Sequence, residues 1–151
     1  MGPCKIQDIG GTTNQLLKVY QTRIRTTLEF AAPVYHSSLT VEQSRQIEMV
    51  QKKAFAIILG KSYTSYQMAL DRLNQMRLED RRTDLSLKFA LKCTKSSKHK
   101  EMFPLNPNFR AGMRCPQPYL EYTCHTARYF NSSIPSLARL LNRNFRKNQK
   151  M

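Results

Sequence analysis

Apolar residues recur at intervals of three and four through most of the first 95 residues, and this spacing stops at a group of prolines after residue 101. Such intervals place side chains on one face of an α-helix, which turns once in about 3.6 residues. The pattern predicts an all-α fold with helices at about residues 13–32, 40–59, 65–74 and 77–95. Because the connections are short, we expect about four neighbouring, largely antiparallel helices in a small bundle.

Start and stop signals accompany these helices. Pro33 is expected to end the first helix or to lie just past its end. Thr40 and Gln43 have the spacing of a capping box at the start of the second helix, and Gly60 suits a left-handed stop after it. The side chains expected to face the core are Leu17, Tyr20, Ile24, Leu28 and Ala31 in the first helix, Ile47, Val50, Ala54 and Ile57 or Ile58 in the second, Tyr66, Ala69, Leu70 and Leu73 in the third, and Leu85, Phe89 and Cys93 in the fourth.

The last third of the chain has a different character. Prolines interrupt any helical pattern there, at positions 104, 107, 116 and 118. Ser133 and Pro135 precede leucines at helical spacing, which predicts one short C-terminal helix with proline in its first turn. The polar, basic residues from Asn142 onward are expected to fray. We therefore predict a helical domain at 1–100 and a Pro-rich, mostly irregular basic segment at 101–151.

Positive charge is concentrated toward the C-terminus of a chain whose formal net charge is +15. Residues 1–84 hold 12 Lys or Arg against eight acids, whereas residues 85–151 hold 13 against two, which leaves the second part at +11. A field of this sign attracts polyanions, because phosphate binding releases condensed counterions. The charge therefore predicts RNA or DNA as the partner, bound through phosphates. Acidic membrane surfaces would be attracted too, and a solvated basic tail would have the same composition.

Several other ligands and locations are not favoured. No run approaches the ~20 apolar residues that a membrane span needs, and no secretory signal is present. The four cysteines include no C-x-x-C pair, so we expect reduced thiols in the cytoplasm or nucleus. Cys115, Cys124 and His125, with Cys93 or His99 as a fourth ligand, match no common zinc spacing. Since there is also no phosphate-binding loop, we predict no metal, no cofactor and no small-molecule substrate.

Short landmarks follow one another in a fixed order over about half of the chain. They are Tyr20, Ile24-Arg25, Leu28-Glu29, Ala32-Pro33-Val34, Leu39-Thr40, Ile47-Glu48, Val50-Gln51-Lys52, Ile57-Ile58, Gly60 and Arg81-Arg82. This order resembles the region that follows the polymerase core in the reverse transcriptases of non-LTR retrotransposons, especially the Jockey-like group. A weaker likeness at residues 128–135 extends the resemblance toward the C-terminus.

The resemblance implies an intact RNA-directed DNA polymerase in which a helical thumb holds the template beside a catalytic palm. Such a palm would precede this region, and its metal-binding aspartate pair has no counterpart here. The adjacent acids Glu79 and Asp80 are followed by Arg81 and Arg82 in a helical pattern, which favours ion pairs over metal ligation. We therefore expect a non-catalytic fragment that is not itself an enzyme. Both arginines, like Arg25, are also candidates for ion pairs that hold the helices together.

The candidate phosphate-binding residues are basic side chains on the expected helices and beside the C-terminal aromatic residues, namely Arg23, Arg25, Lys52, Lys53, Lys92, Lys95, Lys98, Lys100 and Arg128. Tyr119, Tyr122, Tyr129 and Phe130 are candidates for base stacking, with a place in the core as the alternative. Three other interpretations stay open. They are a helix-turn-helix DNA-binding module at 47–74, a host-adopted interaction protein, and a remnant of a decayed element without a selected role.

Overall fold

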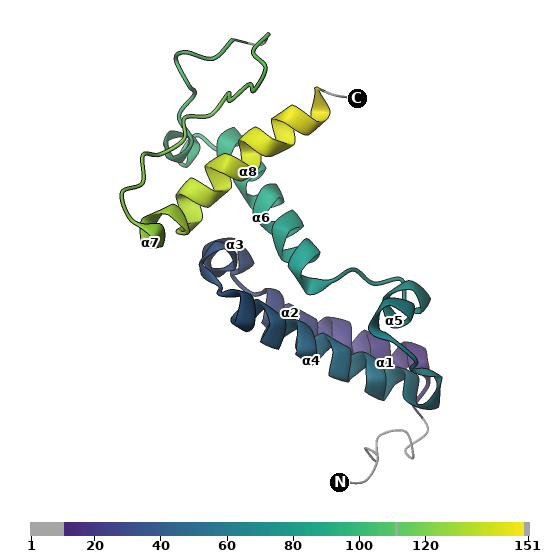
Figure 1. The fold of residues 1–151 in the computed structure, drawn as a ribbon. Coiled ribbons are helices and arrows are strands. Elements are labelled where there is room, and N and C mark those ends of the chain that lie inside the picture. Colours follow the sequence, from purple (N-terminus) through teal and green to yellow (C-terminus); the bar gives the residue numbers. More distant parts are fainter. Residues whose placement is uncertain (1–10, 111, 150–151) are drawn as a thin grey trace. The chain divides into compact units, whose positions relative to one another are not determined.

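The structure, a computed structural model, describes residues 11–110 and 112–149 and confirms the all-helical class (Figure 1). Within these residues there is no β-strand, and an isolated bridge joins Leu105 to Tyr119. Residues 1–10 of the predicted first domain lie outside the described part of the chain.

Two compact units make up the chain. Unit 1 comprises Met1–Phe30 and Thr40–Arg81, and unit 2 comprises Ala31–Leu39 and Arg82–Met151. The division falls inside a helix, so it does not coincide with the predicted domain boundary after residue 100. The reason is that Ala31–Leu39 packs with the C-terminal part of the chain although it lies between two segments of unit 1 in the sequence.

Three helical segments make up most of unit 1. Helix α1 (Thr13–Val19) continues through a π-helical turn (Tyr20–Arg25) into α2 (Thr26–Glu29). Helix α4 (Val41–Leu59) lies alongside α1, and α5 (Tyr66–Arg72) packs against α4 (Figure 1). The second and third predicted helices are therefore confirmed to within a few residues.

Local chemistry sets the ends of α4 as the sequence predicts. The Thr40 hydroxyl accepts from the backbone N–H of Gln43 at 3.1 Å, and the Gln43 side chain accepts from the backbone N–H of Thr40 at 2.9 Å. Gly60 ends the helix with φ 51° and ψ −122°, a conformation that a Cβ atom disfavours strongly. Both the capping box and the glycine stop are confirmed.

The first helix ends earlier than predicted. Its last residue is Glu29, and Ala31 then adopts a left-handed conformation with φ 54°. Pro33 lies in the first turn of the next short helix, α3 (Ala32–Tyr35), where its missing N–H is tolerated. The expected range 13–32 is thus too long, because the reversal at Ala31 redirects the chain into unit 2.

The π-helical turn changes which side chains of the first helix face the core. A π turn contains about one residue more than an α turn. The next inward residue after Tyr20 is therefore Arg25 instead of Ile24. Tyr20 is 2% exposed and Ile24 is 39% exposed, while the Arg25 side chain is 21% exposed. The prediction that Ile24 faces the core is wrong by one position.

The core of unit 1 is apolar at its centre. Its buried members are Tyr20, Phe55, Ile58, Ala69, Leu70 and Leu73. The rings of Tyr20 and Phe55 meet edge to face with centroids 5.3 Å apart. The predicted inner face of α5 is confirmed. That of α4 is confirmed at Ile58 and is otherwise shifted by one residue, since Glu48, Gln51 and Phe55 are buried, and Val50 and Ile57 are exposed.

Gln51 is buried at the centre of a hydrogen-bond network that explains this shift. Its side-chain oxygen accepts from the Tyr20 hydroxyl at 2.5 Å. Its amide nitrogen donates to the Tyr66 hydroxyl and to the backbone carbonyl of Met76, both at 2.9 Å. A glutamine that satisfies its donors and acceptor in this way can be buried at moderate cost.

Glu48 extends the network by one turn of α4. One of its carboxylate oxygens accepts from the Tyr66 hydroxyl and, at 3.3 Å, from the backbone N–H of Leu78 at the start of α6. Burial raises the pKa of Tyr66, and the hydrogen bond to the Glu48 carboxylate raises it further. Burial likewise raises the pKa of Tyr20. Both phenols therefore stay protonated donors well above neutral pH.

Unit 2 contains the remaining helices. They are α3, a following 3-10 turn (His36–Ser38), most of α6 (Leu78–Lys95), α7 (Ala127–Phe130) and α8 (Ser133–Asn148). The core lies between α6 and α8, and its buried members are Ala90, Cys93, Phe103, Leu137, Ala138 and Leu141. The predicted range of α6 is confirmed. Its inner face is confirmed at Cys93 but not at Phe89, which is 43% exposed, while Arg82 and Ser86 are buried.

The C-terminal helix is longer than predicted and does not fray at Asn142. Helix α8 has 16 residues, and Asn142 is fully buried. Its side chain bonds both backbone groups of Tyr119, accepting from the N–H at 3.0 Å and donating to the carbonyl at 3.0 Å. Further along, Phe145 meets Phe109 edge to face with ring centroids 5.7 Å apart. The Pro-rich segment is irregular in conformation but is fixed to α8 by these contacts.

Candidate nucleic-acid interface

Four exposed lysines stand at the end of α6 in unit 2. Lys92 and Lys95 lie in the last turn of the helix, Lys98 follows in the connecting turn, and Lys100 begins a 3-10 turn. Residues 88–100 include no acid, and Glu101 follows Lys100 directly. Cations in the last turn are also favoured by the negative end of the helix dipole. We call these four residues the α6 lysine cluster.

The predicted cations of unit 1 differ in exposure. Arg23, Lys52 and Lys53 are exposed, and the Lys52 ammonium lies 5.1 Å from the centre of the Tyr66 ring. Arg25 instead donates to the Gln75 side chain at 2.9 Å. It is therefore held within unit 1 rather than presented to solvent.

Glu29 interacts with two arginines of unit 1. Arg81 donates two hydrogen bonds to its carboxylate, and Arg25 lies 3.9 Å from the same group. The Glu29 side chain is only 12% exposed, so this paired geometry holds α2 against the start of α6. The structural role considered for Arg25 and Arg81 agrees with these contacts. Arg82 belongs to unit 2 and is described below.

The C-terminal aromatic residues divide into two groups. Tyr119 and Tyr122 pack against the core of unit 2, and the Tyr122 hydroxyl donates to the Met102 carbonyl at 2.6 Å. Burial raises the pKa of Tyr122. Tyr129 and Phe130 are 45% and 48% exposed on α7. The core alternative therefore describes the first pair, and surface stacking is open only to the second.

Arg128 is exposed on α7, next to the exposed aromatic pair. The Arg139 guanidinium lies 3.7 Å from the centre of the Phe130 ring. This cation–π contact with an α8 arginine was not expected from the sequence.

Sequence reasoning missed the basic residues of α8. Arg139, Arg143, Arg146 and Lys147 all belong to this helix. The three that follow Asn142 were overlooked because the helix was expected to stop near that residue. A signal was present, since the apolar series of α8 continues at helical spacing as far as Phe145.

The described cysteines are free thiols in different surroundings. Cys93 is buried, Cys115 is exposed, and the Cys124 thiol donates to the Tyr122 carbonyl at 3.2 Å. Among residues 11–110 and 112–149, no three His, Cys, Asp or Glu side chains come close enough to hold a metal ion. The structure does not bring Cys115, Cys124 and His125 together as a zinc site.

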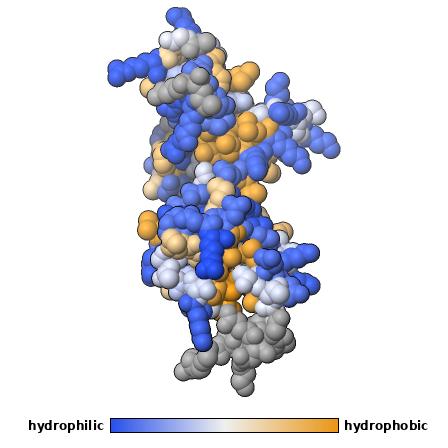
Figure 2. All heavy atoms as spheres, turned by 90° about the vertical axis from the view of Figure 1, so that its right-hand side faces the viewer, coloured by the Kyte–Doolittle hydropathy of each residue, from blue (hydrophilic) through white to orange (hydrophobic). Residues whose placement is uncertain are grey.

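The face shown in Figure 2 carries mainly hydrophilic side chains, with hydrophobic atoms exposed between them. Exposed apolar residues include Phe30, Val34 and Val41, which are at least 63% exposed. In the part of the chain that the structure describes, no helix combines the length and the apolar character needed to cross a bilayer.

Comparisons with protein-family models, curated proteins and solved structures gave no match for this chain. Functional inference therefore depends on the chain itself, on the order of its sequence landmarks and on the charges and contacts described above.

Proposed function

We propose that this chain corresponds to the region after the catalytic palm of a non-LTR retrotransposon reverse transcriptase, and that it binds RNA or DNA through backbone phosphates without catalysing a reaction. The helices of unit 1 would form the thumb-like part, followed by a basic C-terminal part. The order of landmarks from Tyr20 to Arg82 supports the origin. A cytoplasmic or nuclear location follows from the same proposal.

The observation that carries the binding half is the α6 lysine cluster. Exposed lysines on a helix end and the adjoining turn make a local field of one sign, because no acid stands among them. Each phosphate that such a surface neutralises releases condensed counterions, and this release drives association at low salt. Lys52, Lys53 and Arg23 would contribute a second basic surface on unit 1.

The non-catalytic half is supported by the placement of the carboxylates. Two-metal nucleotide transfer needs acids that converge on one point. Glu79 and Asp80 instead lie in the first turn of α6, where the positive end of the helix dipole stabilises their negative charges. Nucleotide incorporation by the purified chain, given primer, template and Mg²⁺, would overturn this half.

Binding is tested by fluorescence anisotropy with a short RNA hairpin and with duplex DNA across a salt series. Replacing Lys92, Lys95 and Lys98 by Gln is expected to reduce the slope of log K against log salt by about 0.7–0.9 for each lost phosphate contact. The matched control replaces Lys18, Lys61 and Lys147 by Gln, which removes the same charge from other exposed positions. Its slope should change less. Equal losses in the two triple variants would show that net charge alone drives binding.

The same titration separates the alternatives. A helix-turn-helix module using α4 and α5 would protect one DNA sequence selectively, and Gln67 and Arg72 on α5 are the exposed side chains to replace. A host-adopted interaction protein would form a complex that survives high salt. Absence of binding to either nucleic acid at low salt would contradict the proposed function.

A further inference from the structure

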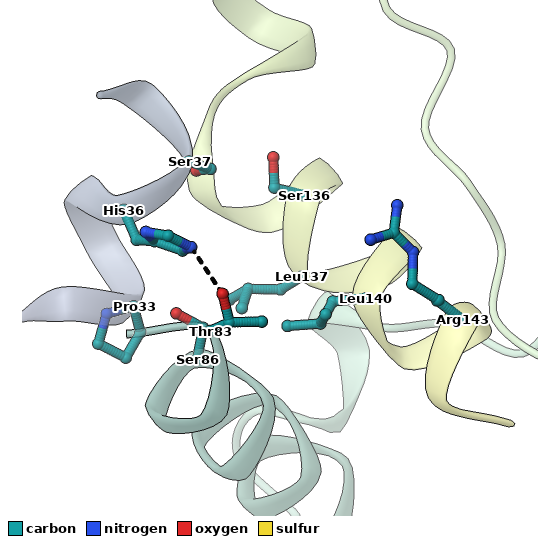
Figure 3. A pocket seen from close by; sticks show the side chains of 9 residues that line it. All are labelled: Pro33, His36, Ser37, Thr83, Ser86, Ser136, Leu137, Leu140 and Arg143. Atoms are coloured by element: carbon teal, nitrogen blue, oxygen red, sulfur yellow. Dashed lines mark hydrogen bonds between the residues drawn. The ribbon is translucent and has the colours of Figure 1, made fainter. Parts of the chain in front are cut away.

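Unit 2 contains a cavity of about 190 Å³ bounded by the 3-10 turn His36–Ser38, by α6 and by α8 (Figure 3). Part of its wall is apolar and comes from Pro33, Leu137 and Leu140. The polar part consists of an imidazole, several hydroxyls and the guanidinium of Arg143. No aspartate or glutamate occurs among the described residues that line it. The formal charge at the lining is therefore positive.

His36 presents a donor on one side and is supported by an arginine on the other. The Nε atom of the fully buried Arg82 donates to His36 Nδ1 at 3.4 Å. An accepting Nδ1 leaves the proton of a neutral imidazole on Nε2. Nε2 lies 3.1 Å from the Thr83 hydroxyl, as the dashed line in Figure 3 marks, and donates to it. The positively charged Arg82 thus contacts a residue that lines the cavity, but does not line it itself.

A second arginine supports the opposite wall. Arg139 donates to the Ser136 hydroxyl oxygen at 2.9 Å and to the Phe130 carbonyl at 2.6 Å. Arg143 follows one turn later on α8 and lines the cavity itself, with an exposed side chain. One arginine therefore lines a cavity without an acid, and two more contact its lining residues, an arrangement that favours an anion.

Ser37 provides an independent sign of a missing ligand. Its hydroxyl oxygen is buried, lines the cavity and has no hydrogen-bond partner among the described residues. Leaving a buried hydroxyl unsatisfied costs about 1–3 kcal/mol. An acceptor oxygen placed in the cavity would remove this cost.

A cavity in unit 1 differs from this one in the charges of the residues that line it. It is lined by Arg45, Lys52 and Arg77, but also by Glu48 and Glu79. The carboxylates would repel an anion, and Arg45 is already paired with Glu42. Of these two cavities, only the one in unit 2 offers donors and positive charge without acids at its lining.

We propose that the unit 2 cavity seats one phosphate group of a bound nucleic-acid strand, an inference that rests on the proposed nucleic-acid binding. Arg143 supplies the charge, and the hydroxyl of Ser37 supplies a hydrogen-bond donor. The apolar wall formed by Leu137 and Leu140 contacts the attached sugar. Since the α6 lysine cluster belongs to the same unit, a strand held there would gain one fixed point among looser phosphate contacts.

The test follows backbone amide signals by NMR while inorganic phosphate, and separately a short single-stranded RNA, is titrated into the full chain. Both are expected to shift the signals of Ser37, Thr83 and Ser136. R143Q should weaken RNA binding roughly tenfold, because a charge-assisted contact is lost. The matched control is R110Q, an exposed arginine of unit 2 that does not line the cavity. It should weaken binding much less.

A second variant separates binding from folding. S37A should weaken RNA binding roughly threefold while leaving thermal stability unchanged or higher, because the hydroxyl it removes has no partner in the free protein. RNA with a neutral methylphosphonate backbone should not shift the cavity signals.

Each failure has a distinct result. RNA that binds without shifting the cavity signals, or R143Q equal to R110Q, would overturn the phosphate seat and leave the proposed function standing. Cavity shifts with inorganic phosphate but no RNA binding would assign the seat to a free phosphate compound, and would overturn the strand assignment together with the proposed function.

Discussion

In unit 1 the buried polar side chains join helices to one another, whereas in unit 2 a buried asparagine joins a helix to an irregular segment. Gln51 and Glu48 link α4 to the π-helical turn, to α5 and to the start of α6. Asn142 instead acts on Tyr119 as a neighbouring β-strand would, bonding its N–H and its carbonyl. A chain with few regular elements after residue 101 can therefore still be ordered there, provided that one helix supplies the missing partners.

The largest expected effect is at the centre of the unit 1 network. Gln51→Leu removes three hydrogen bonds and leaves the Tyr20 hydroxyl and the Met76 carbonyl buried without that partner. It should lower the free energy of unfolding by about 3 kcal/mol in urea titrations. Gln46→Leu, at an exposed position of α4, should change it by less than about 0.5 kcal/mol. Equal small effects would contradict the importance given to the network.

The next effect tests how the irregular segment of unit 2 is held. Asn142→Leu should cost about 2 kcal/mol, because both backbone groups of Tyr119 lose their partner. Hydrogen exchange at the Tyr119 amide should accelerate at the same time. The control Asn148→Leu lies at the exposed end of α8 and should do neither. Unchanged exchange in Asn142→Leu would show that other contacts order the segment.

Alkaline pH should distinguish the two units. The ordinary pKa of tyrosine is 10.0, and burial raises the pKa of Tyr20 and Tyr66 above it. Their contribution to stability is complete below pH 10 and is lost as pH rises above it, because the unfolded chain then releases protons that the folded chain keeps. The free energy of unfolding should fall by about 1.4 kcal/mol per pH unit for each tyrosine.

Tyrosine variants check this assignment. The free energy of unfolding, measured between pH 9 and 11, should depend less on pH when Tyr66 is replaced by Phe. Replacement of Tyr122 of unit 2 by Phe should have a smaller effect on this pH dependence. A Tyr66→Phe variant with the slope of the unaltered chain would be inconsistent with the buried phenol as the cause.

The smallest expected effect concerns helix starts. Thr40→Ala should cost about 1 kcal/mol, since the Thr40 hydroxyl accepts from a backbone N–H of α4. Ser132→Ala at the start of α8 should cost less, because the Ser132 side chain makes no capping bond. Thermal unfolding of the two variants gives the comparison, and a larger loss from Ser132→Ala would reverse it.

Helix positions could be predicted from the sequence because caps and stops act locally. Thr40, Gln43 and Gly60 bound α4 through their own backbone chemistry. The buried faces of the helices were harder to predict, because polar side chains were expected to face the solvent. Gln51 is buried because partners distant in the sequence satisfy it, and the buried Arg82 likewise bonds to His36, so no spacing rule contains that information.

The candidate site shows the same limit. The α6 lysine cluster could be found from composition alone, because exposed charge needs no partner to define it. The cavity of unit 2 could not, since Ser37, Thr83 and Arg143 are brought together only by the packing of the 3-10 turn His36–Ser38, α6 and α8. Arg143 and Arg146 were missed for a different reason, because the helix was expected to end near Asn142.

The π-helical turn has a consequence for how the length of unit 1 can vary. Tyr20–Arg25 already holds one residue beyond ordinary winding. Deletion of one residue there would restore a regular α-helix and keep Glu29 directed at Arg81. Deletion of a residue from α2 would rotate the carboxylate by about 100° relative to the preceding turns. The π-helical turn is thus the position between α1 and α2 at which loss of one residue should be tolerated best.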